Sequence, residues 1–571
     1  MDTAILNLLW SDQLIDGLAA AGVRQVVISP GSRSTPLVLA VNRHPGLKSW
    51  HHPDERSAAF FALGLASHQR QPVAVIATSG SAPAHWLPAV IEANRSGIPL
   101  ILLSADRPPE LQACGSNQTV DQTHLFGSQV RSFHEAGTPA ETPQAFAHIR
   151  RLGIQATHRA VWPAPGPVHV NVSFREPLTP THQPLQAPPG PAVPAPHTLQ
   201  QPDPQQLQRI ARTVDAGRGL IVCGPMPYDE EFFASVTRLA NRLDCPLLAD
   251  PLSGLRFGGH DRTRVISRYD SFLSTDSFKP GEKPTWVLRF GAAPVSKALL
   301  EYLAQPDATL VLCAPWGDWP DPLHQTGEMV RSDPSLFCNA LVDTCSTSSP
   351  HEWLQQFTWA ETAITQLEPP SDTRPCEQAV IEELMAALPD HSILFSGNSL
   401  PIRQLDSWSG QADKRLRIIA NRGASGIDGN ISSLLGLAAA GDQPVVGLLG
   451  DLAFFHDMNG LLFARELDGV IIIFNNNGGG IFGMLPQSGL DTFEQQWLMP
   501  THLDFTHAAR LYGLQHWRIE QQNQFHPALM EGLQSQGMTL IEVMLDREKS
   551  LAAQIQYLKR VQAVCQQDKK P

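Results

Sequence analysis

Short runs of apolar residues, many of them β-branched, recur along the whole chain, and longer stretches with helical spacing separate them. Runs that are apolar at every position are typical of strands in parallel sheets that helices cover on both faces. The strands that this pattern predicts are 25–29, 73–78, 99–104 and 168–172 in the first third, 219–223, 286–290 and 309–313 in the middle, and 392–396, 417–420, 445–450, 470–474 and 539–543 in the last third. We therefore expect an α/β protein with three consecutive domains and mostly parallel sheets.

Two breaks in the pattern predict the domain boundaries. Between residues 177 and 204 proline is so frequent that neither a helix nor a central strand can form, which is typical of a stiff, extended linker. A weaker break consists of two polar, proline-containing segments, 343–350 and 368–375, on either side of a helix predicted over 353–367. The predicted organisation is an N-terminal domain over 1–180, a linker over 181–204, a central α/β domain over 205–365 and a C-terminal domain over 370–571.

Composition and charge exclude several classes of protein. The chain has 571 residues, 42% of them hydrophobic and only 17% charged, which is the composition of a packed globular protein and not of a disordered one. The 42 Lys and Arg residues stand against 55 Asp and Glu residues, a net charge of −13. This balance argues against general nucleic-acid binding, which needs a basic surface. An anionic ligand must therefore meet locally placed Arg or Lys residues.

The sequence has no marks of export or membrane insertion. No basic residue precedes Arg24, whereas a secretory signal begins with a positively charged segment. No apolar run approaches the ~20 residues that span a bilayer. The eight cysteines are scattered and form no C-x-x-C pair. We expect a protein of a reducing compartment, with a cytoplasmic location and no membrane span.

The strongest chemical signal lies between residues 450 and 482, where two polar side chains each follow a predicted strand. Asp451 follows the strand 445–450, and Asn476 comes 25 residues later, after the next strand. Ligands of open α/β sheets bind outside the carboxyl ends of the strands, and carboxylate and amide oxygens suit Mg²⁺. Glycines 478–480 would let the backbone approach a diphosphate. Taken alone, Gly-Asp at 450–451 is better explained as a turn and the Asn- and Gly-rich segment 475–480 as a loop. Together, at the ends of two strands, they indicate a metal and diphosphate site.

This segment resembles the diphosphate and metal motif of thiamine diphosphate enzymes, Gly-Asp-Gly followed by Asn-Asn, although Leu452 stands at the third position. These enzymes also carry a glutamate in the first domain, at the start of a helix, and Glu55 in the segment HHPDERSAAF matches it. The resemblance implies that the Glu55 carboxyl group shares a proton with a ring nitrogen of the cofactor and so promotes its reactive tautomer. Without the resemblance, Asp54 and Glu55 would simply be acidic residues in a helix's first turn, where the helix dipole favours them.

Further segments resemble one family of these enzymes, the 2-succinyl-5-enolpyruvyl-6-hydroxy-3-cyclohexene-1-carboxylate synthases of menaquinone and phylloquinone biosynthesis. The segments are 28–37 (ISPGSRSTPL), 78–111, 115–127 (GSNQTVDQTHLFG), 396–406 (SGNSLPIRQLD), 421–429 (NRGASGIDG) and 475–487 (NNNGGGIFGMLPQ). Leucine after Gly-Asp is usual in this family, so Leu452 agrees with it. The resemblance implies a thiamine diphosphate-binding fold and a transferase that uses thiamine diphosphate and Mg²⁺, or Mn²⁺. In the implied reaction 2-oxoglutarate loses carbon dioxide, and the resulting succinyl semialdehyde carbanion equivalent adds in conjugate fashion to isochorismate.

The resemblance also implies which residues bind the cofactor. They are Glu55, Gln118, Ile427, Asp451, Asn476, Gly478, Ile481, Phe482 and Leu485. Asp451 and Asn476 would ligate the metal through their side chains and Gly478 through its carbonyl group. Ile427 would wedge between the two cofactor rings, and Ile481, Phe482 and Leu485 would form an apolar wall beside the thiazolium. Core packing is the ordinary explanation for such apolar side chains.

Both implied substrates are dianions, so a protein of net charge −13 needs a cluster of cations to bind them. The family's motifs place the substrate-binding residues at Ser32, Arg33, Arg107, Asn117, Gln118, Lys297, Ser399, Arg403 and Arg422. The alternative for any single arginine is a solvated charge or a weak surface ion pair. Ala298 stands where some relatives carry an arginine, so part of the isochorismate contact differs from theirs.

The resemblance implies a homodimer or a homotetramer, because the glutamate-bearing domain of one subunit meets the diphosphate domain of another in this superfamily. Two other interpretations are open. Another thiamine diphosphate enzyme, of the acetolactate synthase or 2-oxoacid decarboxylase type, would keep Glu55, Asp451 and Asn476 without needing the arginines. A noncatalytic protein that kept the fold would be expected to have lost Glu55 or a metal ligand.

Overall fold

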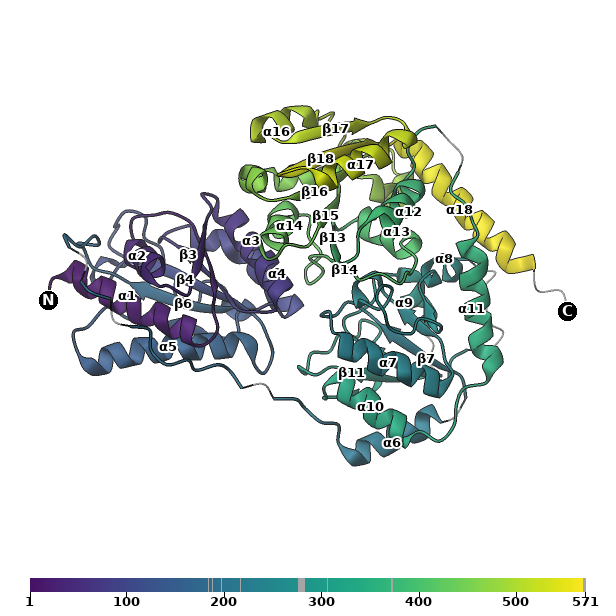
Figure 1. Cartoon of the computed structure of the whole chain (residues 1–571), viewed down its shortest axis with the longest axis horizontal. Helices are drawn as coiled ribbons and strands as arrows, with labels where there is room; N and C mark the ends of the chain where they lie inside the picture. Colours follow the sequence, from purple (N-terminus) through teal and green to yellow (C-terminus); the bar gives the residue numbers. More distant parts are fainter. Residues whose placement is uncertain are drawn as a thin grey trace. The chain divides into compact units, whose positions relative to one another are not determined.

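The computed structural model describes residues 1–567 except 183, 187, 197, 216, 276–282, 305–306 and 371–372. It contains three six-stranded sheets with helices alongside (Figure 1), and the paired strands in all three are parallel. The predicted fold class is confirmed. By packing, the chain divides into two compact units: the first comprises Met1–His197, Asn421–Asp442 and Ala453–Leu467, and the second comprises Thr198–Ala420, Gln443–Leu452 and Asp468–Pro571.

The first unit is built on a sheet with the strand order β2-β1-β3-β4-β6-β5. Its strands are β1 (Gln25–Ile28), β2 (Lys48–His51), β3 (Val73–Ala77), β4 (Leu100–Asp106), β5 (Phe133–Glu135) and β6 (Val168–Ser173). Its helices are α1 (Thr3–Ala20), α2 (Thr35–Arg43), α3 (Glu55–Gln69), α4 (Leu87–Ser96) and α5 (Pro143–Val161). Helices α1 and α5 lie side by side along one face of the sheet (Figure 1), and α3 and α4 cover the other. The central strands are buried on both faces, which explains their continuous apolar runs.

Two segments from the last third of the sequence complete the first unit. Helix α14 (Asn430–Ala439) crosses α3, and the 3₁₀ segment η5 (Met458–Glu466) packs against α14. The crossing is close because Gly64 and Gly436 face each other: a Cβ atom at Gly64 would lie 2.1 Å from the carbonyl oxygen of Ser433. The helix that begins with Glu55 is therefore fixed by backbone contact with α14.

The second unit contains the middle sheet, with the order β12-β11-β10-β7-β8-β9. Its strands are β7 (Gly219–Cys223), β8 (Leu247–Ala249), β9 (Val265–Ile266), β10 (Trp286–Phe290), β11 (Thr309–Cys313) and β12 (Thr326–Val330). The helices of this part are α6 (Pro204–Val214), α7 (Glu230–Leu243), α8 (Tyr269–Leu273), α9 (Lys297–Leu303), α10 (Pro334–Thr344) and α11 (His351–Thr365).

The second unit also contains the last sheet, with the order β14-β13-β15-β16-β18-β17, which repeats the order of the first sheet. Its strands are β13 (Ser392–Ser396), β14 (Leu416–Ile419), β15 (Val445–Gly450), β16 (Gly469–Asn475), β17 (Gln515–Ile519) and β18 (Met538–Met544). The helices are α12 (Glu377–Ala387), α13 (Leu400–Trp408), α15 (Asp451–His456), α16 (Phe505–Tyr512), α17 (Phe525–Gln534) and α18 (Arg547–Gln567). Of these, α15 begins in the second unit and continues into the first.

Each sheet has one place where the chain changes direction across it. The change lies between β1 and β3, between β7 and β10, and between β13 and β15. Loops at the carboxyl ends of the strands diverge there and leave room for ligands. The predicted residues Ser32, Lys297, Ser399 and Asp451 all follow strands at these three places.

The predicted strands and the predicted helix are present, with ends that shift by one or two residues. The helix predicted over 353–367 is α11, which begins two residues earlier and ends two residues earlier. The sequence pattern missed β2, β5, β8, β9, β12 and β17. The predicted domain boundaries stay a prediction, because the two compact units do not follow them.

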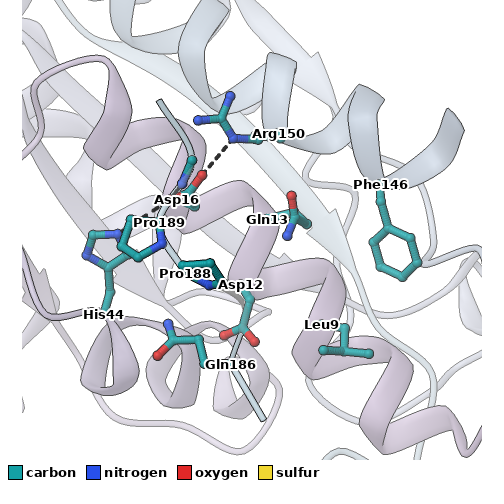
Figure 2. A pocket seen from close by; sticks show the side chains of 11 residues that line it. Leu9, Asp12, Gln13, Asp16, His44, Phe146, Arg150, Gln186, Pro188 and Pro189 are labelled. Carbon is teal, nitrogen blue, oxygen red and sulfur yellow. Dashed lines mark hydrogen bonds and ion pairs between the residues drawn. The ribbon is translucent and has the colours of Figure 1, made fainter. Parts of the chain in front are cut away.

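The predicted linker contains neither helix nor strand in its described residues up to Asp203. Three of its residues, 183, 187 and 197, lie outside the described part of the chain. Val193 N–H donates to the Ala20 carbonyl oxygen (2.8 Å), and Gly190 N–H donates to Asp16 Oδ1 (3.0 Å). The segment also closes one side of a cavity of about 250 Å³ in which Asp16 lies between Arg150 and His44 (Figure 2). The described part of the linker is thus anchored to α1.

Candidate active site

Glu55 is the first residue of α3, the helix that follows β2 in the chain after a short turn. Asp54 caps the helix by accepting a hydrogen bond from Arg56 N–H (3.0 Å), and its carboxylate forms an ion pair with the Arg56 guanidinium (2.7 Å). The pKa of Asp54 is lowered to about 2, chiefly by the hydrogen bonds from the Arg56 side chain. Glu55 is half-buried, and no described residue donates a hydrogen bond to its carboxylate. Asp54 is thus the N-cap of α3, whereas the Glu55 carboxylate has no hydrogen-bond donor among the described residues.

The loop after β1 holds Ser32 and Arg33. Ser32 is exposed, whereas Arg33 is only 4% exposed. The Arg33 guanidinium donates to the Phe174 carbonyl oxygen (2.9 Å) and forms an ion pair with Glu176 (2.8 Å). The Arg33 guanidinium is thus already paired with the carboxylate of Glu176, whose side chain is 70% exposed, and nothing in the local sequence indicated this pair.

Arg107, Gln118 and Ser79 form one cluster at the carboxyl ends of β3 and β4. The Arg107 guanidinium donates to the Gln118 carbonyl oxygen (2.7 Å) and to the Ser79 hydroxyl group. The Gln118 side chain donates to the Ser79 carbonyl oxygen (3.1 Å), and Gln118 has the left-handed backbone angle φ = 53°. Asn117 beside it is exposed. The structure thus brings together Arg107 from the segment 78–111 and Gln118 from the segment 115–127.

The loop between β14 and α14 carries Arg422 and Ile427, both half-buried. The Asn421 side chain donates to the Ser433 hydroxyl group (3.0 Å), which in turn donates to the Phe60 carbonyl oxygen of α3 (3.2 Å). Within the first unit, the loop with Arg422 is therefore connected to the helix that carries Glu55.

In the second unit, Asp451 and the loop after β16 meet at the carboxyl edge of the last sheet. Asp451 is 4% exposed and accepts hydrogen bonds from Leu452 N–H and from Gly478 N–H, both at 2.8 Å. Burial raises the pKa of Asp451 to about 6, although the backbone N–H groups oppose the rise. The Asn476 side-chain oxygen is buried and has no hydrogen-bond partner among the described residues. A buried amide oxygen without a donor beside a buried carboxylate is the donor set that a hard cation fits.

Ser399 and Arg403 occupy the start of α13, directly after β13. Ser399 has the strained left-handed angle φ = 73°, which is uncommon for a residue with a side chain. Arg403 is exposed and donates to the Ser399 carbonyl oxygen (2.6 Å). The motif thus presents a guanidinium group at the edge of the sheet.

Lys297 has the least restrained position of the predicted residues. It begins α9 after β10, its side chain is 89% exposed, and it forms an ion pair with Glu301 one helical turn away (3.2 Å). The apolar wall predicted from Ile481, Phe482 and Leu485 lies in and just after the 3₁₀ segment η6 (Gly480–Met484). Ile481 and Phe482 are half-buried, and Leu485 is 40% exposed.

The two units hold different parts of the predicted site. The first unit contains Ser32, Arg33, Glu55, Arg107, Asn117, Gln118, Arg422 and Ile427, and the second contains Lys297, Ser399, Arg403, Asp451, Asn476, Gly478, Ile481, Phe482 and Leu485. No cluster of three or more His, Cys, Asp or Glu residues suited to a metal occurs among the described residues.

The sequence analysis missed two residues that organise these loops, Ser79 and Glu92. Ser79 lies in the segment 78–111, one of those that carry the family resemblance, and it binds both Arg107 and Gln118. Glu92 is a buried carboxylate in the middle of an apolar helix, and that position is the signal that could have indicated it.

Comparison with known proteins decides the family. Three family models match: the N-terminal TPP binding domain of thiamine pyrophosphate enzymes over residues 10–125, the middle domain of thiamine pyrophosphate enzymes over 195–396, and the C-terminal TPP binding domain over 404–543. A 2-succinyl-5-enolpyruvyl-6-hydroxy-3-cyclohexene-1-carboxylate synthase of Dechloromonas aromatica is 45% identical over 95% of this chain and 99% of its own length. The chain belongs to this synthase family.

Other members support the same assignment. Synthases of the same name from Haloarcula marismortui and Geobacillus thermodenitrificans are each 41% identical, over 97% and 94% of this chain and over 98% and 93% of their own lengths. The prediction of this family is confirmed, and the acetolactate synthase or decarboxylase alternative is not favoured. The chain is thus a member of a family of thiamine pyrophosphate-dependent transferases.

A solved structure supports the fold. The structure is described as that of a candidate thiamin diphosphate-dependent enzyme from Mycobacterium smegmatis, and it matches 94% of this chain and 99% of its own with a TM-score of 0.70 at 18% identity. No helix in the described part of the chain combines the length and apolar character that a membrane crossing requires.

Proposed function

We propose that this member of the synthase family joins 2-oxoglutarate to isochorismate with release of carbon dioxide, giving 2-succinyl-5-enolpyruvyl-6-hydroxy-3-cyclohexene-1-carboxylate in menaquinone or phylloquinone biosynthesis. The observation that carries the proposal is the 45% identity over almost the whole length of a synthase of that name. Glu55, Asp451 and Asn476 are all retained, which favours a catalyst over a noncatalytic relative.

The cofactor would be thiamine diphosphate with Mg²⁺ or Mn²⁺. The Asp451 carboxylate, the Asn476 side-chain oxygen and the Gly478 carbonyl group would hold the metal, and the metal would hold the diphosphate. The buried, unpartnered Asn476 oxygen fits this role, because a bound cation would satisfy it. When bound, thiamine diphosphate supplies the electron sink for the decarboxylation and for formation of the new carbon–carbon bond.

Glu55 would hold the proton that the cofactor's aminopyrimidine ring needs. A half-buried carboxyl group that no described residue pairs with can share a proton with a ring nitrogen. Ile427 would hold the cofactor rings bent, and Gln118 would lie beside them. Ile481, Phe482 and Leu485 would exclude water from the reacting carbon, since an apolar surrounding protects reactive species from protons.

The substrates would be bound by charge and by hydrogen bonds from the loops at the sheet edges. Arg107, Arg403 and Arg422 would bind carboxylates, and Ser32, Asn117, Gln118 and Ser399 would supply hydrogen bonds. Arg33 would bind a substrate carboxylate by exchanging its ion pair with the exposed carboxylate of Glu176 for one with the substrate. The exposed Lys297 ammonium group would bind a substrate carboxylate. The functional protein would be cytoplasmic and would assemble as a homodimer or a homotetramer.

The proposal is tested by following the ultraviolet absorbance of isochorismate with the purified protein. The complete mixture contains Mg²⁺, thiamine diphosphate and 2-oxoglutarate, and each component is left out in turn. We expect isochorismate to be consumed only in the complete mixture. If 2-oxoglutarate or pyruvate loses carbon dioxide while isochorismate is unchanged, the result would support thiamine diphosphate as the cofactor and contradict the proposed condensation with isochorismate.

A further inference from the structure

Glu92 is a buried carboxylate on α4 that binds the backbone of a distant loop. It is 3% exposed. Its Oε1 accepts a hydrogen bond from Gly423 N–H (2.7 Å) and one from the Ser96 hydroxyl group (2.5 Å), and its Oε2 accepts one from Ala424 N–H (2.7 Å). No Lys, Arg or His of the described residues forms an ion pair with it. The charge of Glu92 is therefore compensated mainly by the two N–H groups of the loop.

The loop lies tightly against the end of α4. A Cβ atom at Gly423 would be 2.6 Å from the Ser96 hydroxyl oxygen, 2.7 Å from the Arg95 Cβ and 2.8 Å from the Glu92 carbonyl oxygen. This close approach lets both N–H groups reach the carboxylate. On its other side the loop is held by Asn421, whose side chain donates to Ser433. Arg422 stands between these two anchors.

We propose that Glu92 is a positioning residue for substrate binding, which acts by fixing the loop that presents Arg422. The inference rests on the proposed function, since it assigns Arg422 to a substrate carboxylate. Hydrogen bonds from N–H groups to a carboxylate are about twice as strong as those to a neutral acceptor. Two of them next to Arg422 fix its backbone, and a guanidinium binds a carboxylate well only when it is held in place.

The test compares two substitutions on the same helix. Glu92→Gln keeps the size of the side chain and one acceptor oxygen, but it removes the charge and turns an amide donor toward one loop N–H. Ser96→Ala is the matched control, because it removes a hydrogen bond to the same carboxylate and leaves the two hydrogen bonds from the loop N–H groups in place. We expect Glu92→Gln to raise the KM for a dianionic substrate about tenfold with kcat within about twofold of wild type. Ser96→Ala should behave as wild type.

A double substitution shows whether Glu92 acts through Arg422. If it does, Glu92→Gln added to Arg422→Ala causes little further loss, because the side chain that Glu92 positions is already absent. Losses that multiply would overturn the inference. The inference would also be overturned if Glu92→Gln had wild-type kinetics, or if Ser96→Ala raised the KM as much as Glu92→Gln does.

Amide hydrogen exchange tests the same inference without substrate and so separates its failure from failure of the proposed function. In Glu92→Gln, a peptide over residues 421–428 should exchange at least about tenfold faster, while peptides from β3 and β4 keep their wild-type rates. Unchanged exchange over 421–428, or faster exchange throughout the first unit, would contradict the positioning role. If the wild-type protein does not consume isochorismate, the proposed function fails while this readout still tests the loop.

Discussion

At the scale of single residues, two adjacent acidic side chains at the start of α3 have different roles. Asp54 accepts hydrogen bonds from its own helix and pairs with Arg56, whereas Glu55 has no donor among the described residues. From the sequence alone, both residues are explained in the same way, as acidic side chains that the helix dipole favours in the first turn. The capping geometry now assigns that structural role to Asp54.

We predict that Glu55→Gln retains the fold but lowers kcat by at least about a hundredfold, since a positioned proton donor contributes ~10²–10⁴-fold to a rate. Glutamine cannot share a proton with the cofactor ring. Circular dichroism, thermal unfolding and steady-state turnover of isochorismate measure the two effects. The control is Glu110→Gln, because the Glu110 side chain is 51% exposed and forms a surface ion pair with Arg175. Full activity of Glu55→Gln would remove the proposed proton relay.

Asp457 gives a pH dependence of stability in the first unit. Burial raises its pKa to about 7 from 3.8, and Asp54 and Asp428 raise it further, although Ser432 N–H and the Ser432 hydroxyl group donate to it. The folded chain therefore binds this proton more tightly than the unfolded chain does. The resulting stabilisation is complete below about pH 4 and is lost as the pH rises through about 7.

We predict that Asp457→Asn flattens this part of the stability profile. Each pKa unit corresponds to about 1.4 kcal/mol, so the change between pH 4 and pH 8 amounts to a few kcal/mol. Urea unfolding at both pH values measures it, with the exposed Asp491→Asn as the control. An Asp457→Asn variant with the same loss of stability between the two pH values as wild type would refute this assignment.

At the scale of elements, the sequence predicts most of the strands that are buried on both faces, although it misses the three-residue β8, and it misses most of the strands at the sheet edges. β16 (GVIIIFN) has an apolar run of five residues and is buried over almost its whole length, so it stands out in the sequence. β2 (KSWH) and β17 (QHWRI) are edge strands with exposed residues at both faces, and they carry no such run. β9 has only two residues. Their pairing depends on the neighbouring strand, which local sequence does not encode.

The crossing of α3 and α14 gives a prediction of its own. In Gly64→Ala the new methyl group would meet the Ser433 carbonyl oxygen at 2.1 Å, and a backbone atom cannot move aside as a side chain can. We expect the free energy of unfolding to fall by at least about 2 kcal/mol, with lower turnover because α3 carries Glu55. Urea unfolding and activity assays test this. Gly259→Ala is the matched control, since nothing lies within 4 Å of its added Cβ atom. Equal stability of the two variants would show that the helices can separate without cost.

At the scale of the whole molecule, motif positions were more predictable than the environments of their side chains. The loops with Ser32, Ser399 and Asp451 follow strands at the places where the chain changes direction across its sheets, as parallel topology requires. By contrast, the ion pair of Arg33 with Glu176 joins residues 143 positions apart, and no local pattern indicates it. The exposure of Lys297 could not be predicted either, because it depends on what packs around α9.

A mixed-subunit experiment tests the proposed dimer. Glu55→Gln and Asp451→Asn subunits should each be inactive alone. If every site combines Glu55 of one subunit with Asp451 of another, a mixed dimer has one doubly defective and one intact site. Random mixing then restores about a quarter of the wild-type activity. Absence of any restoration, with mixed dimers verified by mass spectrometry, would place both residues of each site on one chain.

The most direct test of the whole account is the fate of the carbons of 2-oxoglutarate. The wild-type protein is incubated with Mg²⁺, thiamine diphosphate, isochorismate and 2-oxoglutarate, labelled with ¹³C either at the carboxyl carbon beside the ketone or at all other carbons. Mass spectrometry of the products follows each label. We predict that the first label appears only in carbon dioxide and that the others all appear in a product that retains the isochorismate ring. Labelled carbon dioxide without transfer of the remaining carbons to the ring would contradict the account.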